Sequence, residues 1–340
     1  MKILVTGGCG FIGTNFVLAA LKRGYEVINL DLLTYASVGK KVLQVGSSPN
    51  YRFELADICD LRLVQQIIYS AEPDYLVHFA AESHVDRSIA EPVDFISTNI
   101  FGTYSILEVC RNALAKNILP QNFKLIHVST DEVFGSLPVD GYFDETSSFD
   151  PRSPYAASKA SSDHLVSAWF NTYGLPSIIC NCTNNYGKYQ HPEKLIPKTI
   201  ISSILGDQIP VYGRGQQVRD WIHVHDHISA LFLVLEFGMV GERYTIGSDS
   251  QLKNIDLVRM ICTILDGEYP KRFGSYKDQI NFVDDRPGHD FRYAIDATKI
   301  NTTLGWHPKI ELEVGIQETV RWYVENIQNW NSGSWNIEDV

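Results

Sequence analysis

Lys2-Ile-Leu-Val-Thr6 runs directly into Gly7-Gly-Cys-Gly10-Phe-Ile-Gly13, and a helical stretch follows from about Phe11 to Arg23. The first run is apolar and rich in β-branched residues, as in a buried strand. Glycine lets the backbone of a turn approach a ligand closely, and the N-terminus of a helix offers free N–H groups and a positive dipole end. This order of strand, glycine turn and helix predicts a binding site for the pyrophosphate of a dinucleotide.

A second predicted strand runs from Glu26 to Leu30 and ends at Asp31. A carboxylate at that place accepts hydrogen bonds from the adenosine ribose and repels a 2′-phosphate. We therefore expect the cofactor to be NAD rather than NADP.

Strands and helices alternate through the first half of the chain. Strand-like runs lie at 51–56, 75–81, 124–130 and 177–183, and helix-length segments lie at about 61–70, 92–115 and 154–173. This alternation predicts an α/β fold with a Rossmann-type doubly wound parallel sheet covered by helices on both faces.

Ligands of such a sheet bind at the carboxyl ends of its strands. Asp57-Ile58, Phe79-Ala-Ala81 and Ser129-Thr-Asp-Glu132 all follow or end predicted strands. We expect these segments to form one site.

A chain of 340 residues exceeds a single small core. We expect a NAD-binding Rossmann domain at 1–183, with a return segment near 220–248. A smaller C-terminal substrate-binding lobe at 184–340 would be interleaved with it. Past residue 180 the pattern is rich in turns, with short helices between them, and loops of this kind carry specificity.

Composition excludes several classes of protein. No apolar run reaches the ~18 residues of a membrane span, and Met1-Lys2 leads straight into the first strand without a signal segment. We expect a cytoplasmic protein. A net charge of −11 argues against binding to nucleic acid or to a membrane surface. Six scattered cysteines predict no disulfide, and Cys180 and Cys182 are expected to be buried on one strand face.

Two short motifs carry the chemistry. Tyr155 and Lys159 are one helical turn apart, so the ammonium can hold the phenol near its deprotonated form and make it a base for an alcohol. Asp131 and Glu132 are adjacent acids whose pKa values repulsion pushes apart, leaving one to donate a proton and one to accept it. Together the motifs predict an oxidation coupled to an elimination.

Three basic residues in the second half are candidates to grip a diphosphate, because guanidinium groups offer paired donors to phosphate oxygens. They are Arg219, Arg286 and His289. Spacing leaves an equal alternative, which is surface ion pairing with the neighbouring Asp220, Asp285 and Asp290.

The run His223-Val-His-Asp-His227 places two histidines on one strand face, as metal ligands often lie. A strand end that enters a helix explains the run better, and we expect no metal. Tyr35 and Trp221 could stack on adenine or another base, and ordinary packing is an equal alternative.

A series of ordered motifs gives the chain a family resemblance. It resembles the extended short-chain dehydrogenases/reductases and, along nearly its whole length, is similar to the dTDP-glucose 4,6-dehydratases. The motifs are Gly7–Gly13, Asp31 with Leu33-Thr-Tyr-Ala36, His78–Ser88, Ser129–Gly135, Tyr155 with Lys159, Asn184–Gly187, Pro192–Pro197, Arg219–Trp221 and Asp285–Asp290. Related epimerases and decarboxylases keep the Tyr and Lys but are not expected to carry the Asp-Glu pair.

The resemblance implies a lyase that converts a nucleotide-diphosphate glucose into the 4-keto-6-deoxy sugar nucleotide. Tyr155, held by Lys159, would take the proton of the 4-hydroxyl, and Thr130 would bind the same oxygen. Glu132 would take the C5 proton, and Asp131 would protonate the departing C6 hydroxyl. NAD would be reduced and reoxidised within one turnover and would stay bound.

The resemblance also implies two sets of binding residues. The implied cofactor-binding residues are Gly7, Gly10, Phe11, Ile12, Gly13, Asp31, Leu33, Thr34, Asp57, Ile58, Phe79, Ala80, Ala81, Ser83, Thr98, Tyr155, Lys159 and Asn185. The implied substrate-binding residues are Ser83, Thr130, Asp131, Glu132, Asn184, Lys194, Leu195, Pro210, Tyr212, Arg219, Asn254, Arg286 and His289.

The resemblance further implies a homodimer that pairs through helices around 99–115 and 155–173, although apolar stripes on helices more often belong to the core. Alternatives remain open at this point: a nucleotide-sugar 4-epimerase of the same superfamily, a UDP-glucose 4,6-dehydratase, or a cofactor-bound scaffold without turnover.

Overall fold

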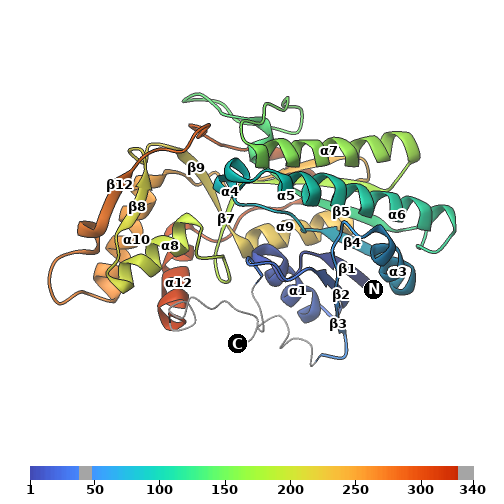
Figure 1. Cartoon of the computed structure of the whole chain (residues 1–340), viewed down its shortest axis with the longest axis horizontal. Coiled ribbons are helices and arrows are strands. Elements are labelled where there is room, and N and C mark those ends of the chain that lie inside the picture. The colour runs from blue at the N-terminus through green and yellow to red at the C-terminus, as the bar shows by residue number, and fades with distance from the viewer. Residues whose placement is uncertain (38–47, 328–340) are drawn as a thin grey trace.

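The computed structural model describes residues 1–37 and 48–327 (Figure 1). Its main element is a seven-stranded sheet in the order β10-β6-β5-β4-β1-β2-β3, and every pairing in this sheet is parallel. The strands are β1 (Lys2–Thr6), β2 (Glu26–Asp31), β3 (Tyr51–Leu55), β4 (Tyr75–His78), β5 (Lys124–Thr130), β6 (Ser177–Cys182) and β10 (Arg243–Ile246). The predicted α/β fold with a Rossmann-type doubly wound sheet is confirmed.

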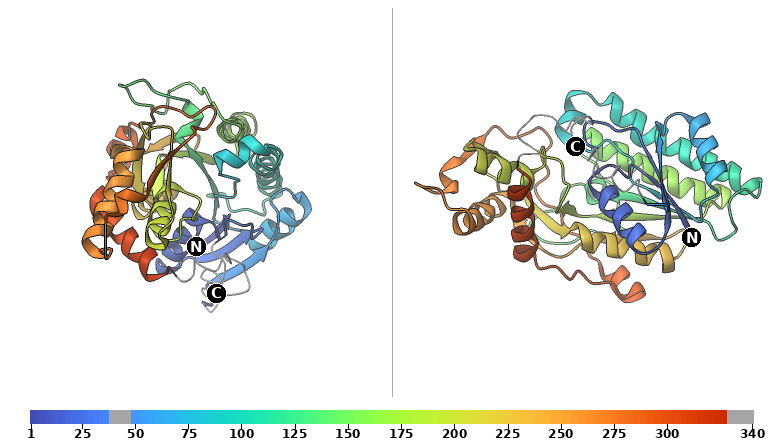
Figure 2. Two further views of the ribbon diagram at one scale, coloured as in Figure 1. Left: turned by 60° about the vertical axis from the view of Figure 1, so that its left-hand side comes forward. Right: turned by 90° about the horizontal axis from the view of Figure 1, so that it is seen from below.

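Helices cover both faces of the sheet (Figure 2). One face carries α1 (Phe11–Lys22), α9 (Val224–Phe237) and α11 (Thr298–Leu304), and the other carries α3 (Leu61–Ala71), α6 (Thr103–Ala115) and α7 (Pro154–Tyr173). Side chains of β1 alternate between the faces: Ile3 and Val5 join one core and Leu4 the other, all without exposed surface. Each buried side chain of this size contributes roughly 1.5–3 kcal/mol. A strand buried on both faces is therefore apolar throughout, as the first run is.

The strand order reverses between β1 and β4. From β1 the chain adds β2 and β3 on one side, and then β4, β5, β6 and β10 on the other. The register places Thr6 opposite both Leu30 and His78, and His78 opposite His127, so neighbouring strands end at similar levels. The crevice outside these carboxyl ends is where open parallel sheets bind ligands.

A second apolar core lies beside the sheet, at the left of Figure 1. It is formed by α8 (Leu195–Leu205), α10 (Asn254–Glu268), α12 (Leu312–Glu325) and the parallel strands β8 (Ile209–Tyr212) and β12 (Ile280–Val283). Between the two cores runs a three-stranded sheet of β11 (Gln251–Lys253), β9 (Val218–His223) and β7 (Asn184–Tyr186).

The expectation of short helices past residue 180 is right for α11, which has 7 residues, and wrong for four longer helices. α8, α9, α10 and α12 have 11, 14, 15 and 14 residues. The described residues contain no side-chain N-cap for α8 or α10, so the usual start signals are missing there. The helices are held by packing instead: Val258, Ile261 and Leu265 form a buried stripe on α10.

The predicted helix at 92–115 is divided. It consists of α5 (Val93–Phe95), a π-helical segment η2 (Ile96–Gly102) and α6. A Cβ at Gly102 would lie 2.4 Å from Ile58 Cδ1, so only glycine lets η2 approach this closely. Such π-helical turns often mark functional sites. The remaining short helices are α4 (Val85–Ala90), η3 (Asp131–Phe134) and η4 (Tyr276–Gln279).

α9 and β10 fall in the predicted return segment near 220–248 and belong to the large sheet. The domain boundary at 183 stays a prediction, and residues 328–340 of the predicted lobe lie outside the described residues. All six cysteines lie within the described residues and are free. Cys180 and Cys182 are buried in β6 as expected. Over the described ranges, no helix combines the length and apolar character that crossing a bilayer requires.

Candidate active site

A cavity of about 330 Å³ opens at the carboxyl ends of the strands. It brings together the strand-end segments that the sequence predicted to share a site. Gly7, Asp31, Phe79, Thr130 and Asn185 come from five parts of the chain and all line it. All the predicted cofactor-binding residues except Leu33 line the cavity: Gly7, Gly10, Phe11, Ile12, Gly13, Asp31, Thr34, Asp57, Ile58, Phe79, Ala80, Ala81, Ser83, Thr98, Tyr155, Lys159 and Asn185.

The glycine turn is shaped by close contacts. Gly7 has a φ of +71°, and a Cβ there would lie 2.5 Å from the backbone nitrogen of Ala80. A Cβ at Gly13 would lie 2.2 Å from the carbonyl oxygen of Gly7. Gly10 caps α1, and within the described residues no side chain accepts from the first N–H groups of that helix. These N–H groups can therefore bind a pyrophosphate.

Asp31 ends β2 at the cavity wall. Its Oδ2 accepts from the backbone N–H of Cys9 at 2.8 Å, and its Oδ1 accepts from the N–H of Leu33 at 2.8 Å. Burial raises the pKa of Asp31, and these hydrogen bonds oppose the rise. Oδ1 also accepts from the Ser37 hydroxyl at 3.3 Å, so Oδ2 is the oxygen that keeps a lone pair for a ribose hydroxyl.

The prediction for the Leu33 side chain does not fit the cavity. Leu33 packs against the core that contains α1, and its neighbour Leu32 lines the cavity instead. Leu33 acts through its backbone N–H on Asp31. Leu33 has a left-handed backbone conformation, with φ +57°, so the regular alternation of side chains along a strand does not continue through it.

The predicted catalytic residues Thr130, Asp131, Glu132, Tyr155 and Lys159 all line the same cavity. η3 begins at Asp131 because the Thr130 hydroxyl accepts from the N–H of Glu132 at 3.3 Å. α7 begins beside Tyr155 because Ser153 caps it, accepting from the N–H of Ala156, and Pro154 occupies its first position. Lys159 Nζ donates to the carbonyl oxygen of Val128 at 2.9 Å.

The surroundings shift the pKa values of the two adjacent acids by different amounts. Burial, together with the charges of Glu132 and Asp220, raises the pKa of Asp131 well above its usual range. Its Oδ1 accepts from the Thr130 hydroxyl at 3.2 Å, and its Oδ2 has no hydrogen-bond partner among the described residues. Asp131 is therefore the member of the pair that holds a proton.

Glu132 is different because cations surround it. Burial raises its pKa, but the charges of Arg286, Arg219 and Lys194 oppose that rise. Glu132 is therefore the member that ionises first. The pKa values of the pair are split in the direction needed for one donor and one acceptor.

The expectation that Lys159 holds the Tyr155 phenol near its deprotonated form is not met by the protein groups alone. Burial and the charge of Glu132 raise the pKa of Tyr155 well above 10, and a hydrogen bond with Thr130 opposes this only in part. Lys159 is itself buried, and burial lowers its pKa. Tyr155 and Lys159 do lie one helical turn apart. Burial of the pair, however, raises the pKa of Tyr155 by more than this spacing lowers it.

The predicted substrate-binding residues fall into two groups. Those that line the cavity are Ser83, Thr130, Asp131, Glu132, Asn184 and Lys194. Those that lie beyond its wall are Leu195, Pro210, Tyr212, Arg219, Asn254, Arg286 and His289. Lys194 lies between these two groups of residues. It immediately precedes α8, and its Nζ donates to the carbonyl oxygen of Ser83 at 2.8 Å.

Arg219 does not pair with Asp220, as the surface-pairing alternative required. Its Nη2 donates to the carbonyl oxygen of Asp290 at 2.9 Å, and its guanidinium lies 4.2 Å from the ring centre of Tyr293. Asp220 instead accepts from the backbone of Ser250. Arg219 is buried and acts on Glu132 rather than on solvent.

Arg286 and His289 lie nearer the surface. An Arg286 Nη1 atom is 3.7 Å from Asp86, and Tyr212 donates to the same carboxyl at 3.0 Å. His289 Nδ1 lies 2.6 Å from Asp285 Oδ1. Burial, with the charge of Arg286, lowers the pKa of His289 to about 4, so this contact is a hydrogen bond of a neutral ring and not a surface ion pair. The Arg286 Nε atom is buried without a partner among the described residues and is a donor available to a ligand oxygen.

Sequence reasoning missed several lining residues. They are Leu30, Leu32, Ala36, Ser37, Ala56, Glu82, Val128, Cys182, Thr183, Gln190, His191 and Glu193. The strand-end rule could have found Cys182 and Thr183, because they end and follow a predicted strand. Gln190 had no local signal: its amide donates to the carbonyl oxygen of Asn185 across a loop.

The histidine run marks a strand end entering a helix, as the favoured interpretation held. His223 ends β9 and caps α9, where its ring accepts from the N–H of His225 at 3.2 Å. His227 is buried and contacts Asn185 at 2.9 Å. Within residues 1–37 and 48–327, no group of three or more His, Cys, Asp or Glu side chains is arranged to hold a metal ion.

The two aromatic candidates are packed. Trp221 is buried in the second core, and the Arg87 guanidinium lies 3.5 Å from the ring centre of Tyr35. Thr34 and Ala36, on either side of Tyr35, line the cavity.

Comparison with known proteins gives consistent matches. The family model described as GDP-mannose 4,6 dehydratase matches residues 4–319. The chain is 49% identical over 350 residues to the dTDP-glucose 4,6-dehydratase of Shigella flexneri, covering 98% of this chain and 97% of that one.

Two solved structures extend the likeness. That of a dTDP-glucose 4,6-dehydratase from Bacillus anthracis in complex with NAD has 42% identity and a TM-score of 0.87, covering 98% of this chain and all of that one. That of the Streptomyces venezuelae enzyme with NAD and TYD bound has 43% identity and a TM-score of 0.88, covering 97% and 98% of the two chains.

Proposed function

The chain belongs to the GDP-mannose 4,6 dehydratase family and, within it, to the dTDP-glucose 4,6-dehydratases, and from that premise we propose how its cavity dehydrates dTDP-glucose. The enzyme is a lyase that uses NAD and yields the 4-keto-6-deoxy sugar nucleotide and water. The observation that carries the proposal is the split acid pair Asp131 and Glu132, which shares one cavity with Tyr155 and Lys159.

The cavity fits NAD. Gly10 leaves the first N–H groups of α1 free for the pyrophosphate, and Asp31 offers acceptors to the ribose. Close packing at Gly7 and Gly13 holds this turn in place. NAD, when bound, supplies the hydride acceptor for C4 of the sugar and the hydride donor for C6.

Tyr155 removes the proton of the sugar 4-hydroxyl, and Thr130 hydrogen-bonds the same oxygen. Lys159 stabilises the phenolate that forms. Because the protein groups raise the pKa of Tyr155, the added positive charge of the nicotinamide is needed as well. The ketone at C4 makes the proton at C5 acidic.

Elimination then uses the acid pair. Glu132 takes the proton from C5, and the electron pair of that C–H bond becomes the C5–C6 double bond. The C6–O bond breaks while Asp131 gives its proton to the leaving hydroxyl, so that water departs. The environment supports these roles, since burial keeps Asp131 protonated while Lys194, Arg219 and Arg286 favour the ionised form of Glu132.

Recognition of the diphosphate is assigned to Lys194 on the cavity wall and to the basic residues Arg219 and Arg286 beyond it. Arg219, Arg286 and Lys194 all act on Glu132, so they lie at the same end of the site. The partner-free donor of Arg286 supports this role. Tyr212 and His289 lie beside it and complete the proposed binding surface.

We also infer a homodimer through the helices around 99–115 and 155–173. Support comes from the exposed apolar side chains Phe101, Tyr104 and Tyr173 on these elements. Light scattering after gel filtration tests this assembly. A cytoplasmic location is proposed with it.

Mass spectrometry of the sugar nucleotide after incubation tests the function. Loss of one water from dTDP-glucose is the expected result. An unchanged mass with a new stereoisomer would establish a 4-epimerase, and no change would establish a scaffold without turnover. A parallel incubation with UDP-glucose distinguishes the two nucleotides, and faster turnover of UDP-glucose would reassign the substrate.

A further inference from the structure

A buried polar network lies behind the catalytic residues. It joins three strands of the large sheet and one covering helix, through His127 of β5, Asn181 of β6, Arg243 of β10 and Asp163 of α7. The first three have no exposed surface, and the Arg243 side chain is 16% exposed. Nothing in the proposed chemistry uses these residues, yet charged groups are seldom buried without a specific arrangement.

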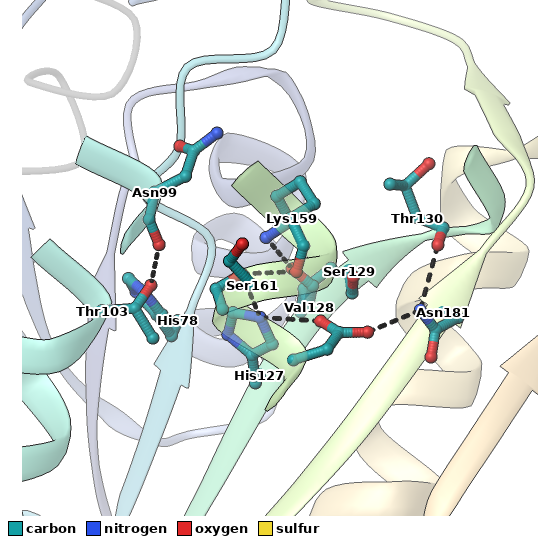
Figure 3. Close-up of polar contacts among 12 residues, drawn as sticks. His78, Asn99, Thr103, His127, Val128, Ser129, Thr130, Lys159, Ser161 and Asn181 are labelled. Carbon is teal, nitrogen blue, oxygen red and sulfur yellow. Dashed lines mark hydrogen bonds and ion pairs between the residues drawn. The ribbon is translucent and has the colours of Figure 1, made fainter. Parts of the chain in front are cut away.

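Asn181 is the centre of the network. Its Nδ2 donates to the carbonyl oxygen of Thr130 at 3.0 Å (Figure 3) and to Asp163 Oδ2 at 3.0 Å. Its Oδ1 accepts from Arg243 Nη1 at 2.7 Å. A carbonyl and a carboxylate on one side and a guanidinium on the other permit only this orientation of the amide. The amide is therefore held by all three partners.

Asp163 forms its hydrogen bonds through Oδ2, and its buried Oδ1 has only a close contact with His127 among the described residues. Oδ2 accepts from Asn181 and from Arg243 Nη1 at 3.1 Å, and Oδ1 lies 3.2 Å from His127 Nε2. Burial raises the pKa of Asp163, but His127 and the charges of Arg243 and Lys159 outweigh burial and hold it at about 2. The pKa of His127 is about 4, chiefly because of burial, so His127 is neutral at pH 7. Arg243 is therefore the ionic partner.

The network reaches two catalytic residues from behind. The Thr130 carbonyl that Asn181 binds belongs to the peptide joining Thr130 to Asp131, so holding this carbonyl fixes the turn that carries both side chains. On α7, Asp163 follows Lys159 by four residues and Tyr155 by eight, which places all three along one side of the helix. The Asp163 carboxylate thus links α7, which carries Tyr155, to the end of β5, which is followed by Asp131.

Asp163 also affects the charge of Lys159. The titratable groups that act on Lys159 from surrounding elements are His78 of β4, His127 of β5 and Cys182 of β6. Burial lowers the pKa of Lys159, and Asp163 opposes that fall more than Cys182 does. His78 and His127 are held neutral by burial, so Asp163, one helical turn from Lys159 along the same side of α7, is the anion that favours the protonated form of Lys159.

We propose that Asp163 is a positioning residue of the active site, holding the Thr130 peptide through Asn181 and serving as the counter-ion of Lys159. This inference rests on the proposed function, because it concerns the oxidation at C4 for which Tyr155 and Lys159 are responsible. The negative charge of Asp163, and not only its volume, is what the reaction requires.

Asp163→Asn tests the proposal, because it keeps the side-chain volume and removes the charge. We expect kcat with dTDP-glucose to fall by about 10- to 100-fold, the range for residues that orient a reacting group from behind, with KM changed less than about threefold. The alkaline limb of the kcat profile should move to lower pH by about one unit, because Lys159 loses its proton more readily without a nearby anion. A primary deuterium isotope effect at C4 should increase.

Glu242→Gln is the matched control. Glu242 immediately precedes Arg243 and forms an ion pair with Lys299 at 2.7 Å, outside the network. This variant should keep the wild-type kcat and the wild-type pH profile. Equal behaviour of the two variants would overturn the proposal.

Asp163→Asn leaves Arg243 without its anion and can unfold the protein. The double variant Asp163→Asn with Arg243→Gln removes both charges. We expect its melting temperature to recover relative to Asp163→Asn while kcat and the shifted alkaline limb do not. Recovery of kcat together with the melting temperature would reduce Asp163 to a structural role and overturn the proposal.

The wild-type protein separates this inference from the function. Wild-type dehydration with an unaffected Asp163→Asn variant overturns the inference alone. A wild-type protein that releases no water from dTDP-glucose overturns the proposed function and, with it, the inference.

Discussion

Replacing Glu132 by Gln should stop the reaction between oxidation and elimination. The amide keeps the volume of the side chain but cannot accept the C5 proton. A positioned general base is worth about 10²–10⁴ in rate, or roughly 3–5 kcal/mol in the barrier, so elimination should slow by that factor.

The oxidation at C4 should not slow in this variant. The charge of Glu132 is one of the causes that raise the pKa of Tyr155, so removing it makes the phenol easier to deprotonate. Glu132 also lies among Arg286, Arg219 and Lys194, and loss of its charge leaves these cations free for the diphosphate. Substrate binding should therefore be unchanged or tighter.

Rapid mixing of Glu132→Gln with dTDP-glucose measures the two steps separately. Absorbance of the enzyme-bound reduced cofactor should rise and persist, while deuterium from heavy water should fail to enter C5. Asp131→Asn offers a comparison, because it keeps the base and removes the acid, so exchange at C5 should continue without loss of water. Turnover of Glu132→Gln at the wild-type rate, or an equal loss of oxidation and elimination, would refute the assignment of the base.

Three further outcomes are expected. Substrate deuterated at C4 should give product with deuterium at C6, and product made in heavy water should carry solvent deuterium at C5; label in free reduced cofactor would show that the cofactor leaves between steps. Asp31→Ala should weaken NAD binding by roughly 1.5–3 kcal/mol for each charge-assisted hydrogen bond lost. The preference of the enzyme for NAD over NADP should also become smaller, as measured by calorimetry with both cofactors. NAD binding as tight as before would show that Asp31 does not lie at the ribose. Gly13→Ala would place a Cβ 2.2 Å from the carbonyl oxygen of Gly7, so the melting temperature and the NAD content of the purified protein should both fall, whereas Gly267→Ala, where a Cβ meets no atom within 4 Å, should leave both unchanged.

The pH dependence of the wild-type enzyme follows from the raised pKa of Glu132. Glu132 must be ionised to accept a proton, and burial raises its pKa. As pH falls, kcat/KM should therefore decline at a pH above that of an ordinary glutamate. The Glu132→Gln variant should lack this acid limb, and a limb that persists in it would belong to another group.

Local sequence determined the elements that surround the site. The run Lys2–Thr6 and the glycines after it specify strand, turn and helix because each signal depends only on residues a few positions apart. α7 was predicted with its observed bounds, because Ser153 and Pro154 start it and Gly174, with φ +69°, ends it. The strand-end rule then placed Asp57, Phe79 and Thr130 in one cavity, since parallel strands present their carboxyl ends at one edge.

Tertiary structure alone decided the charges within that cavity. The repulsion between adjacent acids was evident from their order, but the direction of the split depends on the burial of Asp131 and on Lys194, Arg219 and Arg286, which approach Glu132 from remote parts of the chain. Burial likewise raises the pKa of Tyr155 in the protein by itself, because desolvation depends on the surrounding atoms and not on a four-residue spacing.

The network of His127, Asp163, Asn181 and Arg243 shows most clearly what the sequence alone does not predict. Each residue comes from a different element, and none belongs to a motif with the others. Asn181 meets Thr130 because the register of β5 and β6 places Thr130 opposite Cys182, beside Asn181. The sequence by itself thus determined which chemical groups reach the carboxyl edge of the sheet. Pairing across strands and exclusion of water, which act through space, decided how those groups are charged and held.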